Sequence, residues 1–223
     1  MTLKQRLVVG IAALAVLGCT SGDDPSETTI GGDLAPAQVV TSLFAAIDAG
    51  RFDDAANLTD LDHAALLSLV EGANVTEVAE ALTDEAVSVA SNFWSGFAQT
   101  LDASFSPGNV TVSEGEVIAQ GEARFVTVTV QPADGEARSI VVRRNGDAWV
   151  VDLFATFGSA LSERLLAPVE SILTSANADA ALVRTRLSES ADSLLMAASD
   201  PSLPTAAHQS LLALIERVTR TPG

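Results

Sequence analysis

Cysteine, histidine, tyrosine and lysine are scarce in this chain of 223 residues. It has one cysteine, two histidines and no tyrosine, and Lys4 is its single lysine. One cysteine excludes an intrachain disulfide framework and a thiolate zinc cluster. Two histidines far apart in the sequence leave little for a transition-metal site. We therefore expect no metal and no other cofactor.

Basic residues are also few, with 12 Lys and Arg against 29 Asp and Glu, which gives a formal net charge of −17. The phosphate field of a nucleic acid would repel such a chain, so we expect no nucleic-acid partner. The apolar fraction of 48% argues against a wholly disordered protein. The length allows one or two domains with a sizeable core.

The N-terminus has the pattern of a secretory signal. Lys4 and Arg6 make a short positive region, and an uninterrupted apolar run follows from Leu7 to Gly18. As a helix, this run would reach about 18 Å. That is too short to cross a hydrocarbon core of roughly 30 Å, so we expect a signal peptide rather than a conventional transmembrane span.

The end of this run, Val16-Leu17-Gly18-Cys19, resembles the bacterial lipobox. The resemblance implies that fatty acids such as palmitate are attached through diacylglycerol to the Cys19 sulfur, and that cleavage makes Cys19 the mature N-terminus. It places the protein on the extracytoplasmic face of the cell membrane, in the cell envelope, as a lipoprotein. The alternative is an ordinary secretion signal with a buried thiol.

We accordingly divide the chain into a signal peptide (1–18), an acidic tether (19–33), an α+β domain (34–157) and a C-terminal helical region (158–223). The tether is rich in Ser, Gly, Asp, Glu and Thr, and Ile30 is its only large apolar residue. It cannot bury enough apolar surface to offset the entropy of ordering it.

Residues 36–101 have helical periodicity and residues 109–154 have a period of two, which is typical of strands. Apolar residues recur at helical spacing from Pro36 to Gly50, with further helical segments after Arg51, His63 and Asp84. The strands are expected at 109–119, 122–131, 136–144 and 147–154, and Gly115 indicates a bulge in the first of them. Short turns, Asn145-Gly146 above all, favour an antiparallel meander.

This order resembles the NTF2-like (nuclear transport factor 2-like) family of cone-shaped α+β domains, including domains of unknown function found in lipoproteins. The similar segments are residues 36–56 at the helical opening and residues 144–154 at the closing strand. The resemblance implies N-terminal helices on a curved four-stranded antiparallel sheet. It does not cover the C-terminal region, where three apolar stripes predict helices and Pro168 interrupts the first, so that the helix kinks or restarts there.

The Asp60-Leu61-Asp62-His63 segment is the strongest candidate for an acid–base centre. Enzymes of the NTF2-like family use Asp, His or Tyr within the cone, and this chain has no tyrosine. Asp62 or His63 could therefore act as a base. The alternative is structural, since Asp60 or Asp62 is a good N-cap for the helix that follows.

Aromatic residues offer a second candidate site. They could line a ligand pocket in the cone, or they could fill its interior, because protein cores are densely packed. The pocket candidates are Phe93, Trp94, Phe97, Phe125 and Trp149. Arg143 and Arg144 alternate along an expected strand, so at most one of them faces the concave surface.

We interpret the chain as a membrane-anchored lipoprotein with a non-catalytic binding module for a protein partner or a small apolar ligand. Anchoring is well signalled, while reactive groups are sparse and no P-loop, G-x-S-x-G or G-x-G-x-x-G motif is present. One alternative is a lipid-tethered enzyme that uses an acid or base in the cone. Another is a structural envelope protein that acts through its C-terminal helices.

Overall fold

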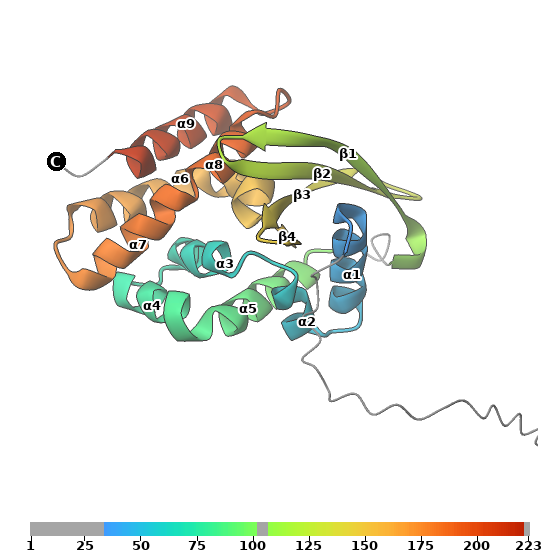
Figure 1. The fold of residues 1–223 in the computed structure, drawn as a ribbon, viewed down its shortest axis with the longest axis horizontal. Helices are drawn as coiled ribbons and strands as arrows, with labels where there is room; N and C mark the ends of the chain where they lie inside the picture. Colours follow the sequence, from blue (N-terminus) through green and yellow to red (C-terminus); the bar gives the residue numbers. More distant parts are fainter. Residues whose placement is uncertain (1–33, 102–106, 221–223) are drawn as a thin grey trace, which may run out of the picture.

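The computed structural model describes residues 34–101 and 107–220. The signal peptide, Cys19 and the tether lie outside the described residues. Within the described part, the chain folds as an α+β protein in which N-terminal helices precede an antiparallel sheet and C-terminal helices follow it (Figure 1). The expected α+β class and the expected order of elements are thereby confirmed.

The N-terminal helices come in short pieces. Their bounds are α1 Pro36–Asp48, α2 Phe52–Asn57, α3 Leu61–Leu67, the 3-10 helix η1 Ser68–Glu71, α4 Val75–Glu80, the π-helical turn η2 Ala81–Glu85 and α5 Ala86–Ala98. Pro36 begins α1, where its missing N–H costs no hydrogen bond. Because α4 runs through η2 into α5, this helical stretch begins at Val75, earlier than the expected Asp84.

The strands form a sheet in the order β1-β2-β3-β4, with each pair antiparallel. The short helix η4 (Pro107–Asn109) leads into the sheet, and the strands are β1 Val110–Gln120, β2 Ala123–Pro132, β3 Arg138–Asn145 and β4 Ala148–Val151. The register of β1 shifts between Glu114 and Val117, which confirms the bulge expected at Gly115. The last hairpin turns at Gly146, whose φ of 57° favours glycine.

Both faces of the sheet bury apolar side chains. Val126, Val128 and Val142 belong to the main core, which they share with α1 and α5. Phe125 and Val141 point to the opposite face, where they pack against Ala155 and Met196. Figure 1 shows α1 under one end of the long, bent strands β1 and β2, and α8 and α9 at the other end.

The C-terminal helices are α6 Leu153–Thr174, α7 Ala178–Glu189, α8 Ala191–Ala198 and α9 Thr205–Thr219. Helix α6 runs across residue 157 and continues through Pro168 without a restart. Its fully buried Leu165 and Val169 belong to the same core cluster as Leu211 of α9 and Val142 of β3. The C-terminal helices therefore share one hydrophobic core with the sheet.

Strand β4 is shorter than the sequence predicts. It ends at Val151 rather than at residue 154, and Phe154 belongs to α6. Asp152 is the N-cap of α6, because its side chain accepts a 2.8 Å hydrogen bond from the backbone N–H of Ala155. The apolar residues on both sides of Asp152, Val151 before it and Leu153 and Phe154 after it, concealed the change from strand to helix.

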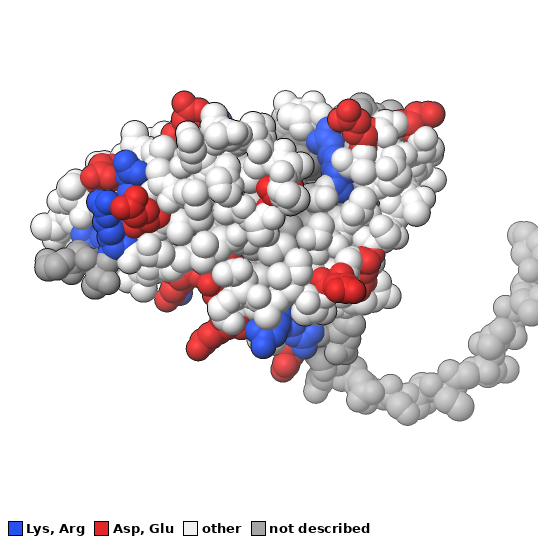
Figure 2. Space-filling model, turned by 90° about the horizontal axis from the view of Figure 1, so that it is seen from above, with Lys and Arg blue, Asp and Glu red and all other residues white. Residues whose placement is uncertain are grey.

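In the described part of the chain, none of the helices combines the length and apolar character needed to span a bilayer. The face of the molecule in Figure 2 carries its arginines in small groups close to Asp and Glu side chains.

Leu211 and Leu212 provide a matched test of the shared core. Leu211 is fully buried whereas Leu212 is 45% exposed in the same turn of α9. We expect Leu211→Ala to lower the free energy of unfolding by about 2–5 kcal/mol, because it leaves a cavity in the core. Leu212→Ala should change it by less than about 0.5 kcal/mol. Urea denaturation followed by circular dichroism measures both, and equal effects would contradict the shared core.

Candidate active site

The site is built where the connection between α2 and α3 lies beside strand β4. The backbone N–H of Val151 donates to Leu58 O over 2.8 Å, and that of Asp60 donates to Val151 O over 2.9 Å. The indole Nε1 of the buried Trp94 donates to Thr59 Oγ1 over 2.8 Å. These bonds fix the connection against the strand, which brings Asp60 close to Asp152.

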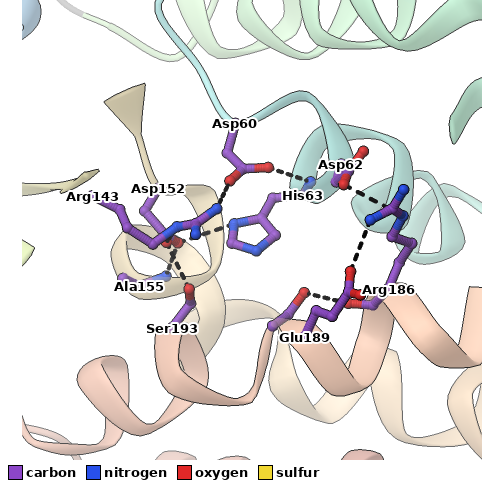
Figure 3. A network of polar contacts seen from close by, with 10 residues as sticks. Asp60, Asp62, His63, Arg143, Asp152, Ala155, Arg186, Glu189 and Ser193 are labelled. Carbon is purple, nitrogen blue, oxygen red and sulfur yellow. Dashed lines mark hydrogen bonds and ion pairs between the residues drawn. The ribbon is translucent and has the colours of Figure 1, made fainter. Parts of the chain in front are cut away.

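Asp152 is the centre of the network in Figure 3 and is fully buried. Its carboxylate caps α6 through the N–H of Ala155 and also accepts a 2.6 Å hydrogen bond from Ser193 Oγ on α8. Two cationic side chains face it, His63 from α3 and Arg143 from β3. A buried charge is tolerated only with such compensation.

His63 contacts Asp152 through one ring nitrogen only. Its Nδ1 lies 3.1 Å from Asp152 Oδ1, as an ion pair rather than an aligned hydrogen bond. The ring packs against Phe154 with 4.7 Å between centroids. Within the described residues, Nε2 has no hydrogen-bond partner, and the side chain is only 4% exposed. The Nε2 atom of a nearly buried imidazole is therefore left to form a hydrogen bond with a bound molecule.

Arg143 connects the two carboxylates. Its Nε lies 3.1 Å from Asp152 Oδ2, and its Nη2 donates to Asp60 Oδ2. Asp60 also caps α3, because its Oδ1 accepts a 3.2 Å hydrogen bond from the backbone N–H of His63. Figure 3 shows these side chains pointing toward one another from α3, β3 and the start of α6. Asp60 is thus the helix cap that the sequence offered as the structural interpretation.

The charges of this network shift the pKa values of its members. Burial alone disfavours the imidazolium, but the facing carboxylates of Asp152 and Asp60 outweigh it and raise the pKa of His63. Burial likewise opposes ionisation of Asp152, yet its pKa is lowered by His63 and by the hydrogen bonds from Ala155 and Ser193. The geometry therefore favours a carboxylate at Asp152 and an imidazolium at His63.

A second, more exposed set of charges lies beside the first. Asp62 Oδ2 lies 3.6 Å from Arg186 Nε, and Arg186 Nη1 donates to Glu189 Oε2 over 2.9 Å. Partial burial raises the pKa of Asp62. The negative charges of Asp60 and Glu189 also raise this pKa, whereas the positive charge of Arg186 lowers it. We call Asp62, Arg186 and Glu189 the rim.

Asp60, His63 and Arg143 line an open cavity of about 560 Å³ together with the rim. Its lining is mostly polar, and Val150 and Leu61 are its apolar members. Arg143 and Glu189 also line a smaller neighbouring cavity of about 320 Å³. The larger volume lies within the range of small-molecule sites.

The cavity can hydrogen-bond a polar molecule and can exchange protons with it. Asp62 is an acid with a raised pKa, and His63 is a base whose cationic form is stabilised. Among residues 34–101 and 107–220, no group of three or more His, Cys, Asp or Glu side chains is arranged to hold a metal ion.

The structure brings the predicted acid–base candidates Asp62 and His63 into this one cavity. The predicted aromatic residues are more dispersed. Phe93 and Phe97 each contact Trp94, and all three contact Phe157, with ring centroids 5.0–6.4 Å apart. Phe125 lies on the other face of the sheet. Trp149 stacks beneath Arg144, whose Cζ lies 5.5 Å from the ring centroid.

Sequence reasoning missed Asp152, Arg143 and Ser193 as site residues. Asp152 does carry a usable signal, because an Asp at the end of an apolar strand that precedes a helical stripe is a typical N-cap. Arg143 lies 83 residues from its partner Asp60, and Ser193 lies 41 residues from its partner Asp152. No local sequence pattern therefore indicates either residue.

Comparison of this chain with protein-family models, with curated proteins and with solved structures found no match.

The pKa of His63 gives the stability of the protein a defined pH dependence. Because the folded state raises this pKa above its unfolded value of about 6.5, the stabilisation is complete below pH 6.5 and is lost as pH rises through the folded-state pKa. We expect the free energy of unfolding to fall over this interval in the wild type and in His208→Gln, and to fall less in His63→Gln. Urea titrations at a series of pH values measure this, and parallel curves for the wild type and His63→Gln would contradict it.

Proposed function

We propose that this protein is a lipoprotein anchored on the extracytoplasmic face of a bacterial cell membrane through Cys19. Its folded part acts there as a non-catalytic binding module with an NTF2-like architecture. The lipobox-like Val16-Leu17-Gly18-Cys19 supports the anchor. The packing of α1 against one face of a bent antiparallel sheet supports the NTF2-like architecture.

The cavity between α3, β3 and α7 is the observation that carries the binding function. Its charged wall is held in place before any ligand arrives, because Asp60, His63, Arg143 and Asp152 fix one another. A preorganised wall reduces the entropy lost on binding. The polar lining favours a small polar ligand over the apolar ligand that the sequence suggested.

Replacement of Cys19 tests the anchor. We expect Cys19→Ala to move the protein from the membrane fraction to the soluble fraction, because it removes the acylated thiol, and Ser21→Ala to leave it on the membrane. Mass spectrometry of the natively expressed protein should find a diacylated residue 19 at the mature N-terminus. An uncleaved leader, or a wild-type protein that is freely released, would contradict the proposal.

Binding in the cavity is tested by nuclear magnetic resonance with a small fragment set of carboxylates, phosphates, amines and neutral amides. We expect at least one class to shift the backbone amides of Leu61, Asp62 and Val150 in a saturable way, since these residues line the cavity. The amides of Gly50 and Asn92, which line a separate surface hollow, are the control. A set that shifts no cavity amide would contradict the binding function.

An acid–base enzyme is the second candidate, and one observation favours it. Asp62 and His63 face the same cavity, and the pKa of each is raised. Two titratable side chains with shifted pKa values in one cavity can act as a proton donor and a proton acceptor. Turnover separates the candidates, because only an enzyme would chemically alter a bound fragment. If Asp62 takes part in the reaction, the Asp62→Asn variant should leave the same fragment unchanged.

A further inference from the structure

The two buried carboxylates use all their oxygens within the protein. Asp152 Oδ1 faces the Ala155 N–H and His63 Nδ1, and its Oδ2 faces Ser193 Oγ and Arg143 Nε. Asp60 divides its oxygens between the His63 N–H and the Arg143 guanidinium. Asp60, which lines the cavity, and the buried Asp152 behind it therefore have little accepting capacity left for a ligand.

The two cations, in contrast, keep unused donors. Within the described residues, neither His63 Nε2 nor Arg143 Nη1 has a hydrogen-bond partner. Both side chains line the cavity, and a quarter of the Arg143 side chain is exposed. An imidazolium and a guanidinium that line the same cavity form a charged, two-point donor site.

We infer that the cavity binds a small carboxylate whose two oxygens accept hydrogen bonds from His63 Nε2 and from Arg143. This inference rests on the proposed binding function and specifies its ligand class. Planar carboxylates match a pair of neighbouring N–H donors. The ligand enters past the rim, where Arg186 adds a third cationic side chain that is 40% exposed.

The charges of the cavity favour a singly charged ligand. The four ions of the network, Asp60, Asp152, His63 and Arg143, sum to zero when all are ionised. The rim contributes two negative charges, from Asp62 and Glu189, and one positive charge, from Arg186. The chain as a whole has a net charge of −17. A phosphate dianion would meet more repulsion there than a carboxylate monoanion. An amine would find its carboxylate acceptors at the exposed rim, where Asp62 and Glu189 already face Arg186, because the oxygens of Asp60 are in use.

Imidazole nitrogen resonances test the inference directly, because His63 and His208 are the only histidines in the chain. Sodium acetate is added to the ¹⁵N-histidine-labelled protein at pH 6, with sodium chloride at the same ionic strength as the reference. We expect a saturable shift of His63 Nε2 with acetate and none with chloride. His208, on α9 and away from the cavity lining, should not move.

Adjacent arginines on opposite faces of β3 provide matched variants. Arg143→Lys keeps the charge but loses the planar set of donors, so we expect acetate affinity to fall roughly tenfold or more. Arg144→Lys, whose side chain lies over Trp149, should bind acetate like the wild type. If Arg143→Lys does not fold, the Nε2 shift of the wild type decides alone.

The remaining outcomes separate the two proposals. If inorganic phosphate or methylammonium shifts the cavity amides while acetate leaves Nε2 unmoved, the carboxylate class is wrong and the binding function stands. If none of these probes shifts Nε2 or the cavity amides, both proposals fail. An acetate shift that is equally large at His208 would also overturn the inference, because it would be an unspecific salt effect.

Discussion

A single buried carboxylate, that of Asp152, sets the arrangement of the parts around it. A charged group without exposure to water requires partners, and each partner comes from a different element. Ala155 belongs to the first turn of α6, Ser193 to α8, His63 to α3 and Arg143 to β3. The position of Asp152 at the end of β4 therefore determines how the N-terminal helices, the sheet and the C-terminal helices meet.

The same compensation produces the chemistry of the cavity. Asp152 and Asp60 are satisfied from within, so they hold His63 and Arg143 in fixed positions without competing for a ligand. Each of these cations keeps a donor that has no partner among the residues the structure describes, and the exposed rim of Asp62, Arg186 and Glu189 borders them. Stability and binding thus depend on the same contacts among these four side chains. A ligand that binds to His63 and Arg143 meets a site that is already organised.

Local patterns in the sequence predicted the elements better than the site. Apolar periodicity, the bulge at Gly115 and the cap at Asp60 are local properties, and the structure confirms them. Asp62 and His63 were found because they are neighbours in the sequence. Asp152 was not found, because the apolar residues Leu153 and Phe154 continue past the end of β4 and hide the capping role of Asp152.

The pairing of Asp60 with Arg143 spans 83 residues, and no local spacing indicates it. It depends on the register of β3 and on the position of the connection before α3, which only the folded chain defines. The extent of the shared core was equally hidden, because periodicity shows that a helix has an apolar face but not what that face covers.

The most direct measurement of this account is the free energy of unfolding of Asp152→Asn beside that of Asp147→Asn. Asp147 lies at the tip of the same hairpin with its side chain fully exposed, and its arginine neighbour is 4.0 Å away. Because Asn is nearly isosteric but uncharged, Asp152→Asn leaves His63 and Arg143 with one carboxylate fewer, and we expect a loss of about 3–5 kcal/mol in the free energy of unfolding. Asp147→Asn should be close to the wild type. Equal stability of the two variants would contradict the central role of the buried carboxylate.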